Sequence, residues 1–270
     1  MKKSNGPGPS YWLFHKAANN VDLLGCFDGW KDSLKRFADK QNLHLIKLLA
    51  TFYYQGHYYL VFPWADGNIF DYWTSFPDPN KPERDWRFVK WMSQQWPAVA
   101  EGLRAIHNAP NHSSILPESS THDPRDLQVH GRHGDLEPSN ILWFKSTDSQ
   151  LEDYNIQGTE DTQDFGLFVI SGFGLMEFHS TQTVDQVSTT GLPRSPTYRP
   201  PECDVSETIS QSFDIWTLGC VLLEFAVFYT DGGDEVDEFS KRRTAEERPA
   251  PIPEDKFFKT IEKATYQRRS

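Results

Sequence analysis

The chain has few cysteines and no long apolar run. Its three cysteines, Cys26, Cys203 and Cys220, are widely spaced and odd in number, and none forms a Cys-x-x-Cys pair. This argues against a disulfide framework and against a zinc or redox site. The longest apolar run, 215–228, is interrupted by Glu224 and is short for a membrane span, and the charged start lacks the apolar core of a signal peptide. We therefore expect a reduced, intracellular protein, cytoplasmic or nuclear, that does not insert into a membrane.

Basic residues are also scarce. Lys and Arg number 27 against 38 Asp and Glu, which gives a net charge of -11 and a pI near 5.3. A nucleic-acid or anionic-membrane surface needs clustered Lys and Arg, so neither partner is expected. The chain is instead 37% hydrophobic and 14% aromatic with nine Trp, a composition typical of a globular protein. Its 270 residues are enough for one domain with a sizeable core.

The most informative segment is 133–140, His-Gly-Asp-Leu-Glu-Pro-Ser-Asn, which is followed by the apolar residues 141–144. In phosphotransfer chemistry an Asp accepts the proton of the incoming hydroxyl, and an Asn five residues later can hold a metal ion on the nucleotide phosphates. Asp135 is thus the candidate catalytic base and Asn140 the candidate metal ligand. A polar turn that enters a strand would have similar residues, and either side chain could instead cap that turn.

Two segments further along the chain strengthen the phosphotransfer interpretation. Residues 195–202, Ser-Pro-Thr-Tyr-Arg-Pro-Pro-Glu, read as a substrate-binding loop and the end of an activation segment, and 213–220, Phe-Asp-Ile-Trp-Thr-Leu-Gly-Cys, open a long apolar helix. With the loop 133–140, and in this order, they resemble the C-terminal lobe of eukaryotic protein kinases, most closely fungal serine/threonine-type sequences. His-Gly-Asp also suits small-molecule kinases of the aminoglycoside and choline phosphotransferase type, but those lack the other two segments.

The resemblance implies an α+β, protein-kinase-like two-lobed fold, with a reduced N-terminal β lobe and a mainly helical C-terminal lobe that lacks its last helices. The N-lobe remnant would cover 1–62, with 1–20 flexible, followed by a hinge at 63–68 and a C-lobe at 69–270. Three polar insertions are expected in the C-lobe, at 109–126, 145–163 and 229–256. We expect the last of them to be a mobile loop.

The hydrophobic pattern places individual elements within this frame. From Trp86 to His107 apolar residues recur at steps of three and four, which predicts one helix with a buried stripe. A second helix is expected over the apolar run that follows Phe213. Strands are expected at 45–53, 58–62, 127–130 and 167–170, the first two joined at Gln55-Gly56.

For nucleotide binding the resemblance implies two places. Backbone groups of Phe62, Pro63 and Trp64 would hold the adenine at the hinge, although the same residues are also typical of a surface turn. Lys16 is the candidate for the strand Lys that grips the phosphates, but its helix partner would fall near Trp30, which cannot form an ion pair. ATP and magnesium are therefore implied as cofactors, with weakened binding.

Further roles carry over from the resemblance. Asp214 would brace the backbone of the loop that contains His133, because a buried carboxylate needs hydrogen-bond donors. Ser195 and Tyr198 belong to the substrate loop, and Ser195 occupies the position of the residue that is typical of serine/threonine kinases.

One structural ion pair of the family lacks its expected partner. Glu202 would pair with an Arg of a late helix, a region that the sequence does not contain. Arg268 or Arg269 could substitute for it. Without a partner Glu202 would be a liability for stability, which suggests a shortened kinase or an incomplete gene product.

Several positions depart from the family pattern. A kinase places its second magnesium on the Asp of an Asp-Phe-Gly triplet directly after a strand, but in this chain the strand 167–170 leads into Gly172-Phe173-Gly174, and residue 172 has no carboxylate. An Asp-Phe-Gly triplet does occur at Asp164-Phe165-Gly166, but it follows a polar stretch and not a strand. We therefore do not interpret it as the metal-binding triplet. Glu137 stands where a Lys usually contacts the transferred phosphoryl group, and Gly134 replaces the Arg that pairs with a phosphorylated activation segment.

These departures predict impaired catalysis. Loss of one group that stabilises transition-state charge costs about 10²- to 10³-fold in rate, and the metal carboxylate, the loop Lys and the strand Lys pair are affected together. The first hypothesis is a kinase-like domain that has largely lost phosphotransfer and acts as a pseudokinase-type binding module with unknown partners. The second is an active kinase that uses Asp135 and Asn140, with Asp164 as an unusual metal ligand. The third is a fragment without a stable function.

Overall fold

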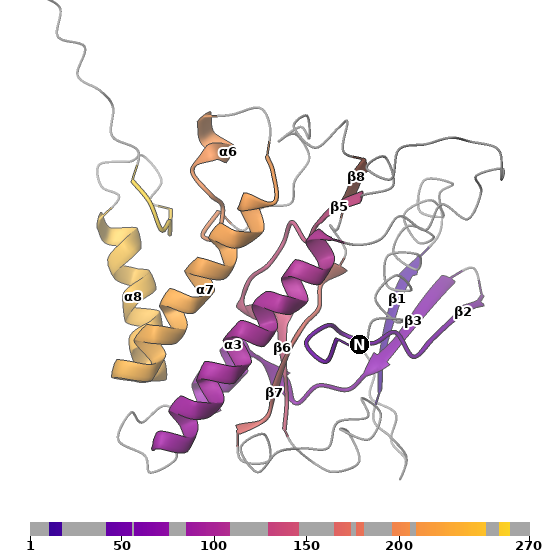
Figure 1. The fold of residues 1–270 in the computed structure, drawn as a ribbon, viewed down its shortest axis with the longest axis horizontal. Helices are drawn as coiled ribbons and strands as arrows, with labels where there is room; N and C mark the ends of the chain where they lie inside the picture. The colour runs from indigo at the N-terminus through magenta and orange to yellow at the C-terminus, as the bar shows by residue number, and fades with distance from the viewer. Residues whose placement is uncertain are drawn as a thin grey trace, which may run out of the picture.

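The computed structural model describes residues 11–17, 42–55, 57–75, 85–108, 129–145, 165–173, 177–180, 196–205, 209–246 and 254–259. Its elements follow one another as β1 (Tyr11–Ala17), β2 (Ala50–Tyr54), β3 (His57–Pro63), β4 (Gly67–Asn68), α2 (Ile69–Ser75), α3 (Trp86–His107), β5 (Val129–Arg132), the 3₁₀ turn η3 (Pro138–Asn140), β6 (Ile141–Phe144), β7 (Leu167–Ile170), β8 (Glu177–Ser180), α6 (Glu202–Val205), α7 (Ser212–Asp231) and α8 (Gly233–Glu246). Figure 1 shows this mixed arrangement of helices and short strands, which is compatible with a reduced kinase-like fold.

The described strands form three small sheets. One has the order β1-β3-β2, the second has the order β4-β6-β7, and β5 pairs with β8. All of these pairings are antiparallel. In Figure 1 the sheet of β1, β3 and β2 lies on one side of the molecule and α7 and α8 lie on the other, with α3, β6 and β7 between them. The β6–β7 hairpin is thus the central element, and it carries the loop 133–140 at one of its ends.

Helix α3 confirms the helix that the hydrophobic pattern predicts, with the same first and last residues. The Asp85 side chain accepts a hydrogen bond from the backbone N–H of Arg87 and so caps the first turn. The buried face of α3 contributes Trp91, which packs against Tyr72 of α2 and Phe168 of β7 with ring centroids 5.9 and 5.1 Å away. Burial of each such side chain stabilises the fold by roughly 1.5–3 kcal/mol, so this aromatic cluster joins α2, α3 and β7 into one core.

Helix α7 is the second long helix and also confirms a predicted element. By length and composition it could cross a membrane, a test that the core helices of soluble proteins also pass, and 50% of its most apolar window is buried inside the fold. Its buried residues include two carboxylates, Asp214 and Glu224. Both have polar partners from other segments, which fits a helix packed within a protein core.

Two predictions of irregular structure are wrong. Residues 233–246, within the expected mobile insertion 229–256, form helix α8. Gly232 ends α7 with a φ of 103°, and Asp234 and Glu235 occupy the first turn of α8, where acidic side chains favour a helix start. Within the expected flexible segment 1–20, residues 11–17 form β1, because their backbone groups pair with β3.

The two other expected polar insertions stay predictions. The segment 109–126 and all of 145–163 except Lys145 lie outside the described residues.

The first predicted strand is also shorter than expected. It begins at Ala50 rather than at Leu45, because the preceding residues pair with β7 instead. The backbone N–H of Ile46 donates to the carbonyl of Ile170 at 2.9 Å, and that of Ile170 donates to the carbonyl of His44 at 2.8 Å. This segment therefore links the sheet of β1, β3 and β2 to the central hairpin.

Candidate functional site

The loop 133–140 is held between β5 and β6. Gly134 has a φ of 79°, a left-handed conformation that side-chain-bearing residues rarely adopt. Glycine at this position, where the family pattern has Arg, therefore fits the local backbone. The loop then closes into η3, where the backbone N–H of Asn140 donates to the carbonyl of Glu137 at 2.9 Å.

Asp214 anchors the loop from the first turn of α7. Its carboxylate is fully buried and accepts hydrogen bonds from the backbone N–H of His133 at 2.8 Å and of Gly134 at 2.9 Å. The ring Nε2 of His107, at the end of α3, lies 2.8 Å from the same carboxylate. The two backbone contacts are of the kind that the resemblance implies for Asp214, whereas the sequence analysis did not predict the His107 contact. A buried carboxylate with this many donors is a rigid support for the loop.

His133 is a neutral link between the loop and the end of β7. Its Nε2 lies 2.7 Å from the carbonyl oxygen of Ser171, and the backbone N–H of Asp135 points to its Nδ1 at 3.3 Å. Burial lowers the pKa of His133, so the tautomer with its proton on Nε2 satisfies both contacts. Phe173 packs edge-on against the His133 ring with centroids 5.6 Å apart. His133 therefore has a structural role.

Asp135 and Asn140 lie side by side, as the spacing predicts. The Asn140 Nδ2 donates to the backbone carbonyl of Asp135 at 2.6 Å and to its Oδ2 at 3.0 Å. Burial raises the pKa of Asp135 to about 6, and the nearby Glu137 carboxylate contributes to the rise, while the Asn140 hydrogen bond opposes it. Glu137 itself accepts a hydrogen bond from the Ser139 hydroxyl. At neutral pH Asp135 is an ionised carboxylate that is more basic than an ordinary Asp, which suits a general base.

The position after β7 lacks the carboxylate that a metal site would need. Gly172 has a φ of 80°, and a Cβ at residue 172 would lie 2.5 Å from both the Cγ and the Oδ1 of Asn140. The Asn140 amide therefore occupies the space where the side chain of a metal-binding residue would begin. Among the described residues no cluster of three or more His, Cys, Asp and Glu side chains could hold a metal ion. The described residues around Asn140 and Gly172 do not fit the magnesium that the kinase pattern implies.

Asp164 lies outside the described residues, and its neighbour Phe165 precedes β7. Phe165 is buried, and its carbonyl accepts a hydrogen bond from the Trp143 Nε1 at 3.1 Å. The hypothesis that Asp164 is an unusual metal ligand therefore stays a prediction.

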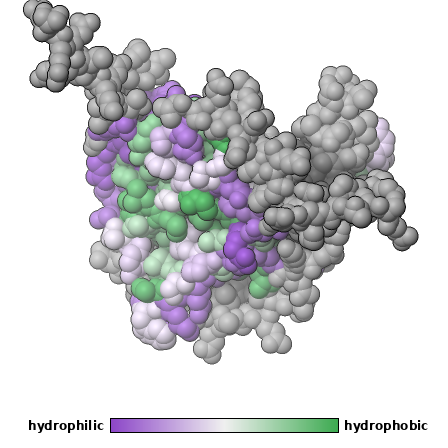
Figure 2. All heavy atoms as spheres, turned by 45° about the horizontal axis from the view of Figure 1, so that its top comes forward, coloured by the Kyte–Doolittle hydropathy of each residue, from purple (hydrophilic) through white to green (hydrophobic). Residues whose placement is uncertain are grey.

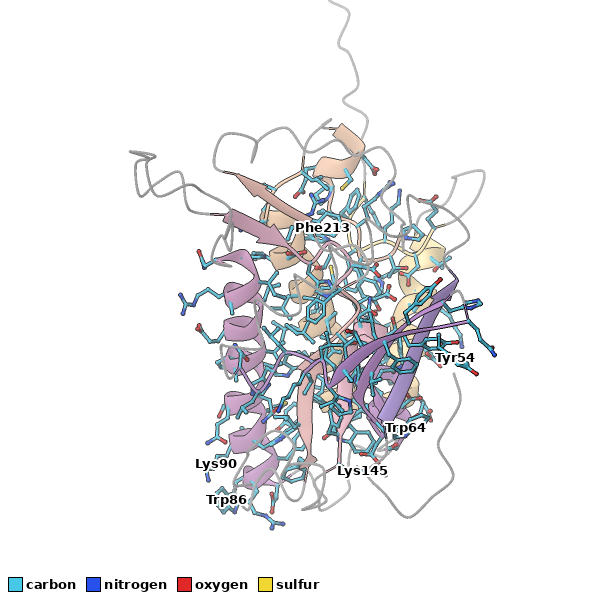
Figure 3. All side chains as sticks on the ribbon, turned by 90° about the vertical axis from the view of Figure 1, so that its right-hand side faces the viewer. Tyr54, Trp64, Trp86, Lys90, Lys145 and Phe213 are labelled. Atoms are coloured by element: carbon cyan, nitrogen blue, oxygen red, sulfur yellow. The ribbon has the colours of Figure 1, made fainter. Side chains whose placement is uncertain are left out.

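The predicted hinge lies where β3 leaves its sheet. Figure 3 shows Trp64 at the base of this sheet, next to the central part of the molecule, and Tyr54 at its outer tip. The hinge segment is tied to the β6 end of the hairpin, because the backbone N–H of Asp66 donates to the Trp143 carbonyl at 3.0 Å and the Asp66 carboxylate accepts from the backbone N–H of Lys145 at 2.7 Å. Pro63 has no N–H, so it can offer only its carbonyl oxygen to an adenine.

Other predicted residues are placed only in part. Ser195 lies outside the described residues, and of Lys16 only the backbone is described, in register with Tyr58. Glu202 begins α6 and accepts a hydrogen bond from the Ser212 hydroxyl at 3.3 Å. The proposed partners Arg268 and Arg269 lie outside the described residues.

Tyr198 belongs to a buried polar network that the sequence analysis missed. Its hydroxyl donates to Glu224 of α7 at 2.8 Å, and Arg243 of α8 donates to the other Glu224 oxygen at 2.8 Å. Arg243 also donates to Asp255 at 2.6 Å and stacks on Phe257, its guanidinium carbon 4.0 Å from the ring centroid. The network ties the substrate-loop segment to α7, α8 and 254–259. Regular spacing could not have revealed it, because its members are far apart in the sequence.

No protein-family profile matches the chain. A stretch of 98 residues, 36% of the chain, is 33% identical to the dual specificity protein kinase CLK1 of Mus musculus. The match spans 19% of that relative, about a fifth of its length. This partial similarity supports a kinase-like relationship and kinase-like ancestry.

Proposed function

We propose that this chain is a kinase-like domain in which metal-dependent phosphotransfer is impaired and which acts as a binding module. The observation that carries this proposal is Gly172, whose backbone lies against Asn140 at the position where a kinase has its metal-binding carboxylate. Asn140 alone offers one amide oxygen. Magnesium in phosphotransfer sites is typically held by one or two carboxylates together with the phosphates.

The loop 133–140 keeps its base and the residues that support it. Asp135 is a competent base with a raised pKa, and Asp214 and His133 keep it in place. What is lost is charge stabilisation: Glu137, also in the loop, places a negative charge where a phosphate-contacting Lys is usual. Kinases with complete sites turn over about 1–100 times per second, and each missing electrostatic group costs about 10²- to 10³-fold.

By ancestry the domain remains of the serine/threonine type. In this proposal 63–68 is the hinge between the two lobes, and Phe62, Pro63 and Trp64 hold an adenine nucleotide with little dependence on a metal ion. The hinge residues lie beside the β6 end of the central hairpin, which supports this placement. We also propose that the domain binds an intracellular protein partner.

Transfer of radiolabelled phosphate from ATP to casein tests the proposal. We expect less than about 0.1 turnovers per second for the wild type. The double variant Gly172→Asp/Glu137→Lys restores a carboxylate and a cation. A Cβ at residue 172 would lie 2.5 Å from the Asn140 amide, so Asn140 must shift to admit the carboxylate, and we then expect at least a tenfold gain. Adding Asp135→Asn should abolish that gain.

Two outcomes would contradict the proposal. Wild-type turnover near one per second that disappears in Asp135→Asn would establish an active kinase instead. Heat-unfolding curves without a cooperative transition would favour a fragment without a stable fold.

A further inference from the structure

An apolar pocket lies along α7, on the side that faces α6 and the segment 254–259. Its volume is about 860 Å³. The lining includes Ile215, Trp216, Gly219 and Leu223 of α7, together with Glu202 and Phe257. Figure 2 shows hydrophobic residues gathered on the face of the molecule over α7, with hydrophilic residues around them. We call this feature the α7 groove.

Large apolar side chains of the α7 groove are exposed. Ile215 is 60% exposed and Leu223 is 48% exposed, and Leu222 beside them is 36% exposed. Residues 215, 219 and 223 follow at steps of four and therefore share one face of the helix. A contiguous exposed apolar surface with a polar rim is typical of an interaction site rather than of free protein surface.

Gly219 keeps the floor of the α7 groove open. It lies in the interior of a 20-residue helix, and a Cβ built there meets nothing within 4 Å. Glycine weakens a helix interior relative to alanine, and no close neighbour among the described residues requires it at this position. The missing side chain leaves room for an occupant to approach the helix backbone.

Two polar groups of the α7 groove lack partners of the kind they need. Among the described residues no cation pairs with the Glu202 carboxylate, whose one contact there is the Ser212 hydroxyl. The indole N–H of Trp216 is buried and has no acceptor within the described part of the chain. An occupant with a cation would pair with the Glu202 carboxylate. The net charge of -11 also favours a basic ligand over a second copy of this chain, because like charges repel.

We propose that the α7 groove docks a segment of a partner protein that presents aliphatic or aromatic side chains next to an Arg or Lys. The apolar side chains would lie over Gly219 between Ile215 and Leu223, and the cation would pair with Glu202. This is the helix-in-groove mode of peptide recognition. The inference rests on the proposed role as a binding module and names the surface and the partner chemistry.

Fluorescence anisotropy on the full chain tests whether the α7 groove docks such a segment. The probe is a labelled 11-residue peptide in which leucines at helical spacing alternate with arginines. Gly219→Trp places a large side chain in the α7 groove, at a position where a Cβ meets nothing within 4 Å, and we expect it to weaken binding at least tenfold. Gly219→Ala leaves the groove open and should bind within twofold of the wild type. Glu202→Lys, at the rim, should weaken binding about as much as Gly219→Trp.

Several results would overturn the proposal. These are no binding of the probe to the wild type, unchanged binding to Gly219→Trp, and equal binding of a scrambled peptide of the same charge. A wild-type dimer in sedimentation that Gly219→Trp dissociates would assign the groove to a second copy instead. The phosphate-transfer assay does not depend on Gly219, so failure of the docking proposal and failure of the proposed function are distinguishable.

Discussion

Replacement of Asp214 should destabilise the protein more than any exposed substitution on the same helix. The carboxylate is fully buried and accepts two backbone hydrogen bonds from the loop, in addition to the contact with the His107 ring. Asp214→Ala leaves these donors without an acceptor, and each buried unsatisfied donor costs about 1–3 kcal/mol. We expect a total loss of about 3–5 kcal/mol, the range found when one partner of a buried charged pair is removed.

Asp214→Asn is the milder test, because it keeps one acceptor oxygen and turns the other into a donor that faces a backbone N–H. We expect a loss of about 2–3 kcal/mol. Urea unfolding followed by circular dichroism gives the free energy of unfolding for both variants. Asp231→Asn, an exposed change at the other end of α7, is the matched control and should stay within about 0.5 kcal/mol of the wild type. A loss below about 1 kcal/mol for Asp214→Ala would refute the view of Asp214 as the anchor of the loop.

The remaining predictions concern Asp135 and Gly172, which both lie against Asn140. The folded-state pKa of Asp135 is raised to about 6 from 3.8, so between these values the folded state binds more protons and the free energy of unfolding falls as pH rises. Asp135→Asn removes this penalty and, allowing for partial exposure, should stabilise the protein by about 1–2 kcal/mol at pH 8 relative to pH 4. Unfolding titrations at both pH values measure the difference, and an equal effect at both would show that ionisation of Asp135 does not oppose folding. Gly172→Ala should cost about 1–3 kcal/mol because of its left-handed φ and its contact with Asn140. In an Asn140→Ala background the cost should be smaller, and an unchanged cost would show that the contact does not matter.

The elements with strong hydrophobic periodicity could be predicted from sequence. Helix α3 and strand β7 have the predicted bounds, because each has a regular apolar pattern with one side or both sides buried. Helix α8 was missed because it is polar around most of its surface and has no apolar stripe. Its charged side chains instead pair at helical spacing, as in Lys241 with Glu238 at 2.6 Å.

The candidate site was predictable where its residues are close in the sequence. The spacing of Asp135 and Asn140 within one tight turn places them together, and the resemblance to kinases supplied Asp214. The contact of Asn140 with the Gly172 backbone could not be predicted, because it depends on how β6 and β7 pair. The Arg243 network was missed for the same reason: its partners meet only after α7 and α8 have packed.

The most direct test of the central claim is a thermal-shift titration with ATP in the presence and absence of magnesium. A site without a carboxylate at residue 172 should give the same small stabilisation by ATP with and without the metal. In Gly172→Asp the Asn140 amide must shift to admit the new side chain, and the melting temperature with ATP should then rise further when magnesium is added. A large magnesium-dependent rise in the wild type would contradict the account, because it would require a metal ligand that Gly172 does not provide.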